Sequence, residues 1–490
     1  MLESAIQGLT PEILWQRFYE ISQIPRPSKK EGKIRDYLRK LIKDMNLTFR
    51  EDKVGNIVVK VPATKEYEGV PVVVLQGHID MVGEKNKNII HDFENDPLKL
   101  KKEDGWITAD GTTLGSDNGI GIAAALSIIT DKDVIHGPLE ILFTIDEETG
   151  LTGANSLKPG FITGKILLNM DSEEDGAFYV GCAGGIDTVG TFNLEKELVP
   201  NNTSAYNLIV SGLKGGHSGL DINLGRGNAI KILTRVLKSL EGLEFYVSKL
   251  EGGSKRNAIP REAEALLYIS SSEVNKANNL IKELESRIRN ELKSSDEKIS
   301  ITFQKSDESS NFVFDTDFSN RIIDTLLALP SGVISMSQDI PDLIETSTNL
   351  ATITTGEDSI IIGTSQRSSI ESAKQYIAQS VLAIFSLADA NIEIGNEYPG
   401  WKPDMNSQIL KTSINVYKNL FNKEPEIKAI HAGLECGILG NKNPGLDMVS
   451  FGPTIQGAHS PDEKVNIETV IHFYELLKGI LKTLATVNKG

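Results

Sequence analysis

The chain has 490 residues, 39% of them hydrophobic and 24% charged, which excludes a disordered or collagen-like protein and leaves room for two to four folded domains. Its 51 basic and 67 acidic residues give a net charge of −16, so we expect no nucleic-acid partner. Two cysteines without a CxxC pattern, no signal-peptide pattern and no apolar run of about 20 residues together predict a cytoplasmic protein with no membrane partner.

Predicted helices and strands alternate in the first part of the chain. We expect a helix with Thr10 as its N-cap and Pro11 at its first position, and a second helix over 29–45. Strands are predicted over 55–61, 71–79, 139–145 and 165–171, with a buried helix over 119–129. The near-continuous β-branched and aliphatic runs are typical of strands buried on both faces. This alternation predicts an α/β layer with a largely parallel sheet.

The pattern changes near residue 187 and changes back near residue 398. Between these points, helices with polar faces alternate with more polar strands, which predicts a pair of α+β modules. The elements predicted there are helices over 226–240 and 271–292 and strands over 262–270, 298–306 and 358–365. Afterwards we expect a helix over 407–421, a strand near 446–452 and a helix over 466–487. The simplest organisation is a domain of residues 1–187 and 398–490, interrupted by an inserted domain of residues 188–397.

Histidine and carboxylate side chains follow the predicted buried strands. His78 and Asp80 end one strand, Asp146-Glu147-Glu148 follows another, Asp171 follows a third, and Asp117 begins the buried helix. Ligands of open α/β sheets bind at the carboxyl ends of the strands. Each acid alone would be explained as a solvated loop residue or a helix cap, but clustered carboxylates repel one another and require a cation.

Imidazole together with carboxylates suits zinc, manganese or cobalt better than calcium or magnesium. One histidine for each ion and a shared carboxylate suggest two ions, and therefore a second histidine. His459 supplies it, in a loop rich in glycine and proline before the last predicted helix.

Six sequence blocks carry a resemblance to a known family. They are GHIDMV (77–82), GTTLGSDNGIGIA (111–123), DEETG (146–150), NMDSEE (169–174), GGHSG (215–219) and GAHSPDE (457–463). They resemble the metal-binding blocks of the M20 family of dinuclear zinc exopeptidases, and most closely its aminoacyl-histidine dipeptidase subfamily. The resemblance covers essentially the whole chain. It implies a phosphorylase/hydrolase-like zinc exopeptidase fold of the α/β class, with an inserted α+β lid domain.

The resemblance also implies two zinc sites that share one carboxylate, with cobalt or manganese as substitutes. His78, Asp117 and Asp171 would hold one ion. Asp117, Glu148 and His459 would hold the other, with Asp117 as the bridge. Asp80 and Glu147, described next, would complete this part of the site.

Further roles follow from the same resemblance. Asp80 would orient the imidazole two residues before it, and Glu147 would be the general base. His217, in a glycine-rich turn that matches no phosphate-binding motif, would donate to the oxyanion. The family also often has a cis peptide after the bridging aspartate, here Asp117-Asn118.

Asn257 and Arg367 resemble the residues that bind the substrate's C-terminal carboxylate, a group that suits the planar fork of arginine. For Glu435, in the block HAGLECG, binding of a substrate amino group and a structural brace are equally open. Arg226 is expected to cap or brace its helix. The roles of three more residues stay open, namely His431, Glu173 and Glu174.

We therefore expect a dipeptidase that hydrolyses Xaa-His and other unblocked dipeptides, with the lid closing on the substrate about hinges near residues 187 and 398. An M20-type deacylase or broader aminopeptidase is the alternative. A zinc-loaded protein without turnover is disfavoured, because Glu147 and all five ligand positions are filled. Both a monomer and a homodimer are compatible with the resemblance.

Overall fold

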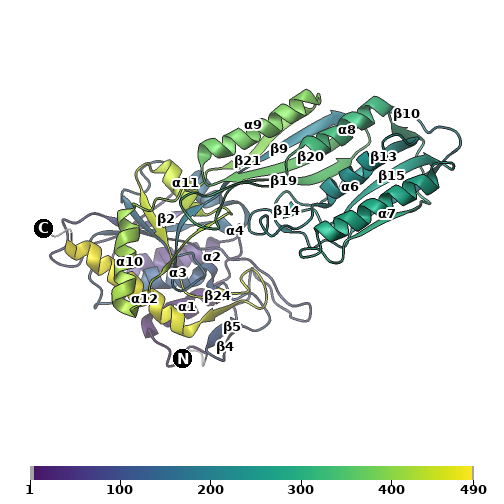
Figure 1. Ribbon diagram of the computed structural model, residues 1–490. Coiled ribbons are helices and arrows are strands. Elements are labelled where there is room, and N and C mark those ends of the chain that lie inside the picture. Colours follow the sequence, from purple (N-terminus) through teal and green to yellow (C-terminus); the bar gives the residue numbers. More distant parts are fainter. Residues whose placement is uncertain (1–4, 488–490) are drawn as a thin grey trace. The chain divides into compact units, whose positions relative to one another are not determined.

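The computed structural model describes residues 5–487, and the chain divides into two compact units (Figure 1). Unit 1 comprises Met1–Gly181, Pro403–Ala429 and Leu434–Gly490, and unit 2 comprises Cys182–Lys402 and Ile430–Gly433. Unit 2 is therefore one long inserted segment together with four later residues. Among the described residues, no helix is both long and apolar enough to cross a bilayer.

Unit 1 is built on an eight-stranded sheet, two of whose central strands are buried along their whole length. In spatial order its strands are β1 (Thr48–Glu51), β2 (Ile57–Val61), β6 (Leu139–Thr144), β3 (Val73–His78), β7 (Ile166–Asn169), β23 (Asp447–Ser450), β8 (Ala177–Cys182) and β22 (Glu426–Ile430). Every residue of β3 and β6 is buried, as expected for strands covered on both faces.

Four neighbouring strands, β6, β3, β7 and β23, pair in parallel. The first two strands, β1 and β2, are antiparallel to their neighbours, so the expectation of a largely parallel sheet holds only for the centre. A strand that follows its neighbour through a short connection pairs antiparallel, because a parallel partner requires a longer crossover.

Helices cover this sheet, and α3 is the most deeply buried of them. The helices of unit 1 are α1 (Glu12–Ser22), α2 (Gly32–Asp44), α3 (Ser116–Thr130), α4 (Glu147–Gly150), α5 (Thr152–Ser156), α10 (Gln408–Phe421), α11 (Glu435–Lys442) and α12 (Ile467–Val487). Helix α3 contacts both β3 and α1, and this explains why its sequence is apolar on all sides.

The predicted start of α1 was wrong by one residue. The helix begins at Glu12 with Pro11 at the N-cap position, where Pro11 has an extended ψ of 126°. Thr10 lies before the helix, and its backbone oxygen accepts a hydrogen bond from the Trp15 indole nitrogen, 3.3 Å away. Proline lacks an N–H group and therefore suits the cap position as well as the first turn.

Unit 1 also contains a small four-stranded sheet near the start of α3. Its strands, in spatial order, are β24 (Ile455–Gln456), β25 (Lys464–Asn466), β5 (Trp106–Ala109) and β4 (Leu100–Glu103). All three pairings are antiparallel. Through β25 and β5, this sheet ties the C-terminal loop that carries His459 to the segment that precedes α3.

Unit 2 contains one antiparallel sheet of nine strands. Eight of them lie in the order β16 (Ser300–Lys305), β11 (Thr203–Ser211), β15 (Ala263–Ser270), β13 (Phe245–Gly252), β19 (Ile344–Thr355), β20 (Ser359–Ser368), β9 (Gly184–Asn193) and β21 (Asn391–Tyr398), and β18 (Gly332–Met336) pairs with β19. Two short pairs accompany it, β10 (Lys196–Leu198) with β17 (Phe312–Phe314) and β12 (Gly216–His217) with β14 (Ala258–Ile259). The two halves of the large sheet join at β13 and β19, where only two residue pairs are in register.

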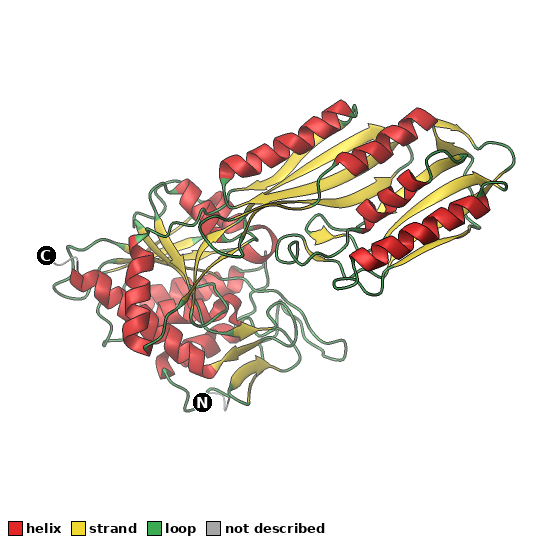
Figure 2. Cartoon of the chain, viewed as in Figure 1, coloured by secondary structure: helices red, strands yellow, loops and turns green. Residues whose placement is uncertain are grey.

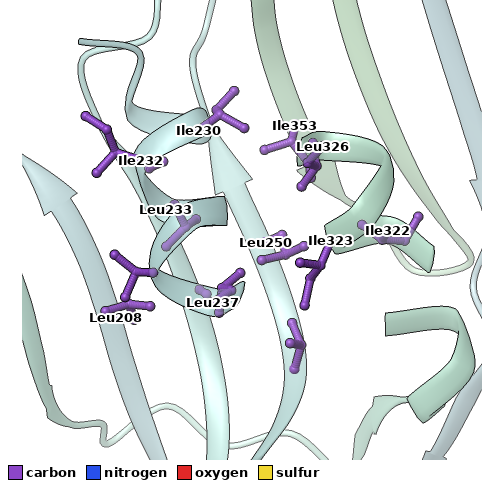
Figure 3. Packing of buried hydrophobic residues seen from close by; sticks show 14 of the residues in the cluster. Leu208, Ile230, Ile232, Leu233, Leu237, Leu250, Ile322, Ile323, Leu326 and Ile353 are labelled. Atoms are coloured by element: carbon purple, nitrogen blue, oxygen red, sulfur yellow. The ribbon is translucent and has the colours of Figure 1, made fainter. Parts of the chain in front are cut away.

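Four helices form one layer over a face of this sheet (Figure 2). They are α6 (Ala229–Ser239), α7 (Val274–Glu291), α8 (Thr316–Ala328) and α9 (Glu371–Leu387), and they contact one another in the order α7, α6, α8, α9. Figure 3 shows the core between them and the sheet, where Leu233 of α6 and Leu326 of α8 are 2% exposed and Leu250 of β13 is 1% exposed. This shared core holds both halves of the sheet together.

Candidate metal centre

Five side chains from separate segments of unit 1 meet around Asp117. Nε2 of His78 lies 3.0 Å from Oδ1 of Asp117 and 3.2 Å from Oδ1 of Asp171. Nε2 of His459 lies 3.1 Å from Oδ2 of Asp117 and 2.9 Å from Oε2 of Glu148. Asp117 therefore presents one carboxylate oxygen to each histidine, and each histidine contacts one further carboxylate.

The parallel strands bring three of these residues to one edge of the sheet. His78 is the last residue of β3, Glu148 follows β6, and Asp171 follows β7. The register pairs His78 with Thr144 and Gln76 with Asn169, so the three strands end at the same level. The structure thus brings together the strand-end residues that the sequence pattern places at this edge.

Asp117 is held by an irregular first turn of α3. Its backbone is not helical, with φ −79° and ψ 112°, and the peptide bond to Asn118 is cis, as the family resemblance implies. The Asn118 amide donates to the backbone oxygen of Met170, 2.6 Å away. A Cβ atom at Gly121 would lie 2.6 Å from the same oxygen, so only glycine allows α3 to approach the end of β7 this closely.

Asp80 lies directly behind the histidine that ends β3. Its Oδ1 is 3.3 Å from Nδ1 of His78, the ring nitrogen that faces away from Asp117. Its two carboxylate oxygens also accept hydrogen bonds from the backbone N–H groups of Glu147, at 3.1 Å, and Glu148, at 3.3 Å. One buried carboxylate therefore orients an imidazole and the segment that carries Glu147 and Glu148 at the same time.

Arg26 supports the same region, and the sequence pattern did not indicate it. Its guanidinium is 1% exposed and donates to the backbone oxygens of Ile79, at 3.1 Å, and Asp80, at 2.7 Å, as well as to Gly115. A lone arginine between two prolines in a short loop carries no recognisable pattern. Its contacts link the end of β3 to the start of α3.

The ionisation of these groups reflects crowding of negative charge. Burial raises the pKa of Asp171 to about 6 and that of Glu173 to about 8, and neighbouring carboxylates add to both shifts. Hydrogen bonds to Asp117 and Glu148 raise the pKa of His459 to about 11. At neutral pH, Glu173 and His459 therefore hold protons that isolated side chains would release.

The donor set fits divalent cations. One ligand atom from each of His78, Asp117 and Glu148 lies within 4.8 Å of the other two. Within the described part of the chain, the buried Oε1 of Glu148 accepts no hydrogen bond. An unsatisfied carboxylate oxygen beside two imidazoles is what a cation would complete.

Glu435 lies beneath this cluster and is 1% exposed. Its Oε2 accepts hydrogen bonds from the Gln76 amide and the Thr144 hydroxyl, both at 2.6 Å. Burial raises its pKa to about 7. Of the two roles left open for Glu435, these contacts favour the structural brace. Glu174 is bound by Lys428, with Nζ 2.6 Å from its Oε1.

In unit 2, polar side chains form a cluster around Arg367, which is 7% exposed. Its Nη1 donates to the Tyr398 hydroxyl, 2.8 Å away. Ser347 pairs with Arg367 in the β19–β20 ladder, and its Oγ lies 2.7 Å from Nε2 of His431. Among the described residues, no hydrogen-bond partner reaches Nε of Arg367. A bound ligand would supply a hydrogen-bond partner to this cluster.

His217 adjoins the cluster, in the turn that β12 begins. Its Nδ1 accepts hydrogen bonds from the backbone N–H groups of Gly219 and Leu220, both at 3.1 Å. The neutral ring must then carry its proton on Nε2. Asn257 is exposed, and its backbone oxygen accepts a hydrogen bond from the N–H of Ser218, 2.9 Å away.

The expectation that Arg226 braces its own helix was wrong. Its Nη1 donates to the backbone oxygen of Gly215, 2.6 Å away, and lies 3.2 Å from Oδ2 of Asp221. It therefore braces the loop that carries His217. The first turn of α6 is capped by Asn228, whose side chain accepts from two backbone N–H groups. An arginine side chain is long enough to reach back across the turn before its helix.

Comparisons with known proteins are consistent along nearly the whole chain. The model of peptidase family M20/M25/M40 matches residues 74–483. The cytosol non-specific dipeptidase of Escherichia coli is 40% identical over 484 residues, which cover 98% of this chain and 99% of that protein.

Solved structures agree with this result. The aminoacylhistidine dipeptidase of Vibrio alginolyticus is 41% identical and superimposes with a TM-score of 0.91, covering 98% of each chain. The aminopeptidase PepT of Bacillus cereus, at 18% identity and a TM-score of 0.58 over 97% of this chain and 99% of that one, shares the fold. The chain therefore belongs to peptidase family M20/M25/M40, has the mixed α/β fold of that family, and is an enzyme that hydrolyses peptide bonds.

Proposed function

We propose that the protein is a dipeptidase that hydrolyses Xaa-His and other unblocked dipeptides at a centre of two divalent metal ions. One observation carries the proposal: the two carboxylate oxygens of Asp117 face two different histidines, His78 and His459. A carboxylate in this position can bridge two ions, each with its own imidazole.

The five ligands divide into two sets that share Asp117. His78 and Asp171 would complete the first set, and Glu148 and His459 the second. The contacts described above support this division, because Nε2 of each histidine contacts Asp117 and the second carboxylate of its own set. Zinc is the proposed metal, with cobalt or manganese as substitutes, since imidazole and carboxylate donors suit these ions.

Glu147 is proposed as the general base. Bound metal ions would lower the pKa of a water molecule and polarise the scissile carbonyl. Glu147 then accepts the proton of the attacking water on its carboxylate and passes it to the leaving amine. Burial raises the pKa of Glu147 well above its ordinary value; His78 opposes this rise and Asp171 adds to it. A base beside cations needs such a raised pKa to retain basicity at neutral pH.

Unit 2 is proposed to supply the contacts to the substrate. The proton on Nε2 of His217 is available to donate to the oxygen of the scissile carbonyl, since Nδ1 is already an acceptor. Burial and the charge of Arg367 lower the pKa values of both His217 and His431. With both rings neutral, the positive charge of these three side chains belongs to Arg367, which therefore suits the C-terminal carboxylate of a dipeptide. Asn257 is proposed to bind the same carboxylate.

The relatives support the substrate class and the location. Those that match over nearly the whole chain are named a cytosol non-specific dipeptidase and an aminoacylhistidine dipeptidase. These names favour a cytoplasmic dipeptidase over the alternative, an M20-type deacylase or broader aminopeptidase. Residues 188–397 are proposed to act as a lid on the catalytic part, residues 1–187 and 398–490, in a monomer or a homodimer.

The substitution Glu147→Gln tests the general base. We expect turnover of a Xaa-His dipeptide to fall at least a thousandfold, because the amide cannot accept the proton, while two equivalents of metal remain bound. Steady-state kinetics and elemental analysis measure both quantities. Glu103→Gln, an exposed change of the same kind in β4, should leave both unchanged. Activity of Glu147→Gln within tenfold of the wild type would show that the base is another group.

The substitution Arg367→Ala tests the carboxylate contact. We expect KM to rise about 10- to 100-fold for free dipeptides, because these substrates lose a charge-assisted hydrogen-bonded pair. For C-terminally amidated dipeptides, which lack the carboxylate, KM should rise by about threefold at most. Arg287→Ala, which removes an exposed arginine of α7, is the matched control. An equal rise for free and amidated substrates would reject the carboxylate contact.

The buried His431 makes the stability of the fold depend on pH. Burial and the charge of Arg367 lower its pKa to about 3. Between pH 6.5 and 3 the unfolded chain therefore binds a proton at this ring that the folded chain does not, so stability falls as the pH falls.

From pH 6.5 to pH 5, we expect the wild type to lose about 1.5 kcal/mol more free energy of unfolding than His431→Gln. Urea denaturation of the metal-free proteins at the two pH values, followed by circular dichroism, measures this difference. Equal losses for the two proteins would mean that His431 titrates normally in the folded state.

A further inference from the structure

A single carboxylate, that of Glu463, holds the start of α3. It is 2% exposed. Its Oε2 accepts hydrogen bonds from the N–H groups of Leu114, at 2.8 Å, and Gly115, at 2.9 Å. Its Oε1 accepts from the N–H and the hydroxyl of Ser116, at 2.7 and 2.6 Å, and from the N–H of Asp117, at 3.3 Å. Five donors from four successive residues thus converge on one side chain.

These donors have no alternative partner within the helix. The first N–H groups of any helix lack intrahelical acceptors, and the residue at the N-cap position here, Gly115, has no side chain to supply one. The backbone of Asp117 is itself non-helical, so the first turn of α3 departs further from regular helix geometry. A carboxylate is the acceptor that a set of converging amide groups at a helix start favours most. Glu463 therefore determines how this turn is folded, from a position 346 residues away from Asp117.

The backbone of Glu463 is also connected to His459, which lies four residues earlier in the same loop. The loop between them is a compact turn, in which the N–H of Ser460 donates to Gly457, at 3.2 Å, and the N–H of Glu463 donates to Ser460, at 3.1 Å. The backbone oxygen of Glu463 accepts from the Thr108 hydroxyl, 2.8 Å away. The loop is therefore anchored immediately after His459, although the His459 side chain itself is 54% exposed.

We propose that Glu463 is a positioning residue that sets the placement of His459 relative to Asp117, and thereby the affinity of the second ion. This inference rests on the proposed metal centre. Glu463 acts through the backbone of Asp117 and through its own loop, without contacting an ion. The first ion shares Asp117, but its other two ligands, His78 and Asp171, stand on strand ends that Glu463 does not touch. The first ion should therefore depend on Glu463 less than the second ion, for which Glu463 affects both Asp117 and His459.

The substitution Glu463→Gln separates this role from a general structural one. Glutamine has the same shape, but its amide nitrogen would face N–H groups that it cannot accept from, so the turn at Ser116 and Asp117 must shift. Zinc titration of the metal-free chain, by calorimetry with a competing chelator, measures each binding step. We expect one equivalent to weaken at least tenfold, as for other groups that orient metal ligands, and the other to weaken less than threefold.

Two comparisons make the result decisive. Glu468→Gln, an exposed change in the first turn of α12, should bind both equivalents as the wild type does. If Glu463→Gln does not fold, Ser116→Ala takes its place, because it removes only the hydroxyl hydrogen bond; one equivalent should then weaken at least threefold.

Unchanged binding of both equivalents, or an equal loss of both accompanied by a lower Tm of the metal-free variant, would overturn the positioning role. A wild-type chain that binds no zinc would instead overturn the proposed metal centre itself, so the two failures are distinguishable.

Discussion

The repulsion between carboxylates at one edge of a buried sheet is the constraint on which the rest of unit 1 depends. Asp117, Glu148 and Asp171 meet within reach of two imidazoles, and the half-buried Glu147 precedes Glu148 in the chain. Negative charges this close in a buried region are stable only if they hold protons, contact cationic side chains or bind metal ions. The pKa of nearby Glu173, raised by burial and by Asp117 and Asp171 to about 8, shows the first response in the chain alone. Binding of metal ions would instead free these carboxylates to act as ligands and Glu147 to act as a base.

The surrounding residues hold the cluster in place through backbone atoms rather than through direct contact. Asp80 binds the N–H groups of the segment that carries Glu147, Arg26 binds carbonyl oxygens on both sides of the cluster, and Glu463 binds the start of α3. Each of these charged groups is buried and makes several hydrogen bonds. Such a network fixes the directions of the ligands more firmly than side-chain packing alone, because every hydrogen bond constrains an angle as well as a distance.

The sequence predicted the part of the site that follows from strand geometry. Parallel strands share a carboxyl edge, so His78, Glu148 and Asp171 were expected together, and their register now shows why. The role of Glu463 was not predicted, although it lies in the block GAHSPDE, because its partners are backbone amides that carry no side-chain pattern. The joining of the two halves of unit 2 into one sheet was not predicted either. It depends on two residue pairs between β13 and β19, whose residues look like those of any other strand pair.

Unit 2 offers a different chemistry from unit 1. Arg367 carries a permanent positive charge, His217 is a neutral ring whose hydrogen bonds set its tautomer, and His431 is a buried ring that contacts Ser347. The account as a whole nevertheless stands on the bridging position of Asp117. Anomalous diffraction at the zinc absorption edge, from crystals of the protein grown with zinc, tests this position most directly. Two peaks are expected, one against Nε2 of His78 and one against Nε2 of His459, with Asp117 contacting both. A single peak, or peaks that Asp117 does not contact, would contradict it.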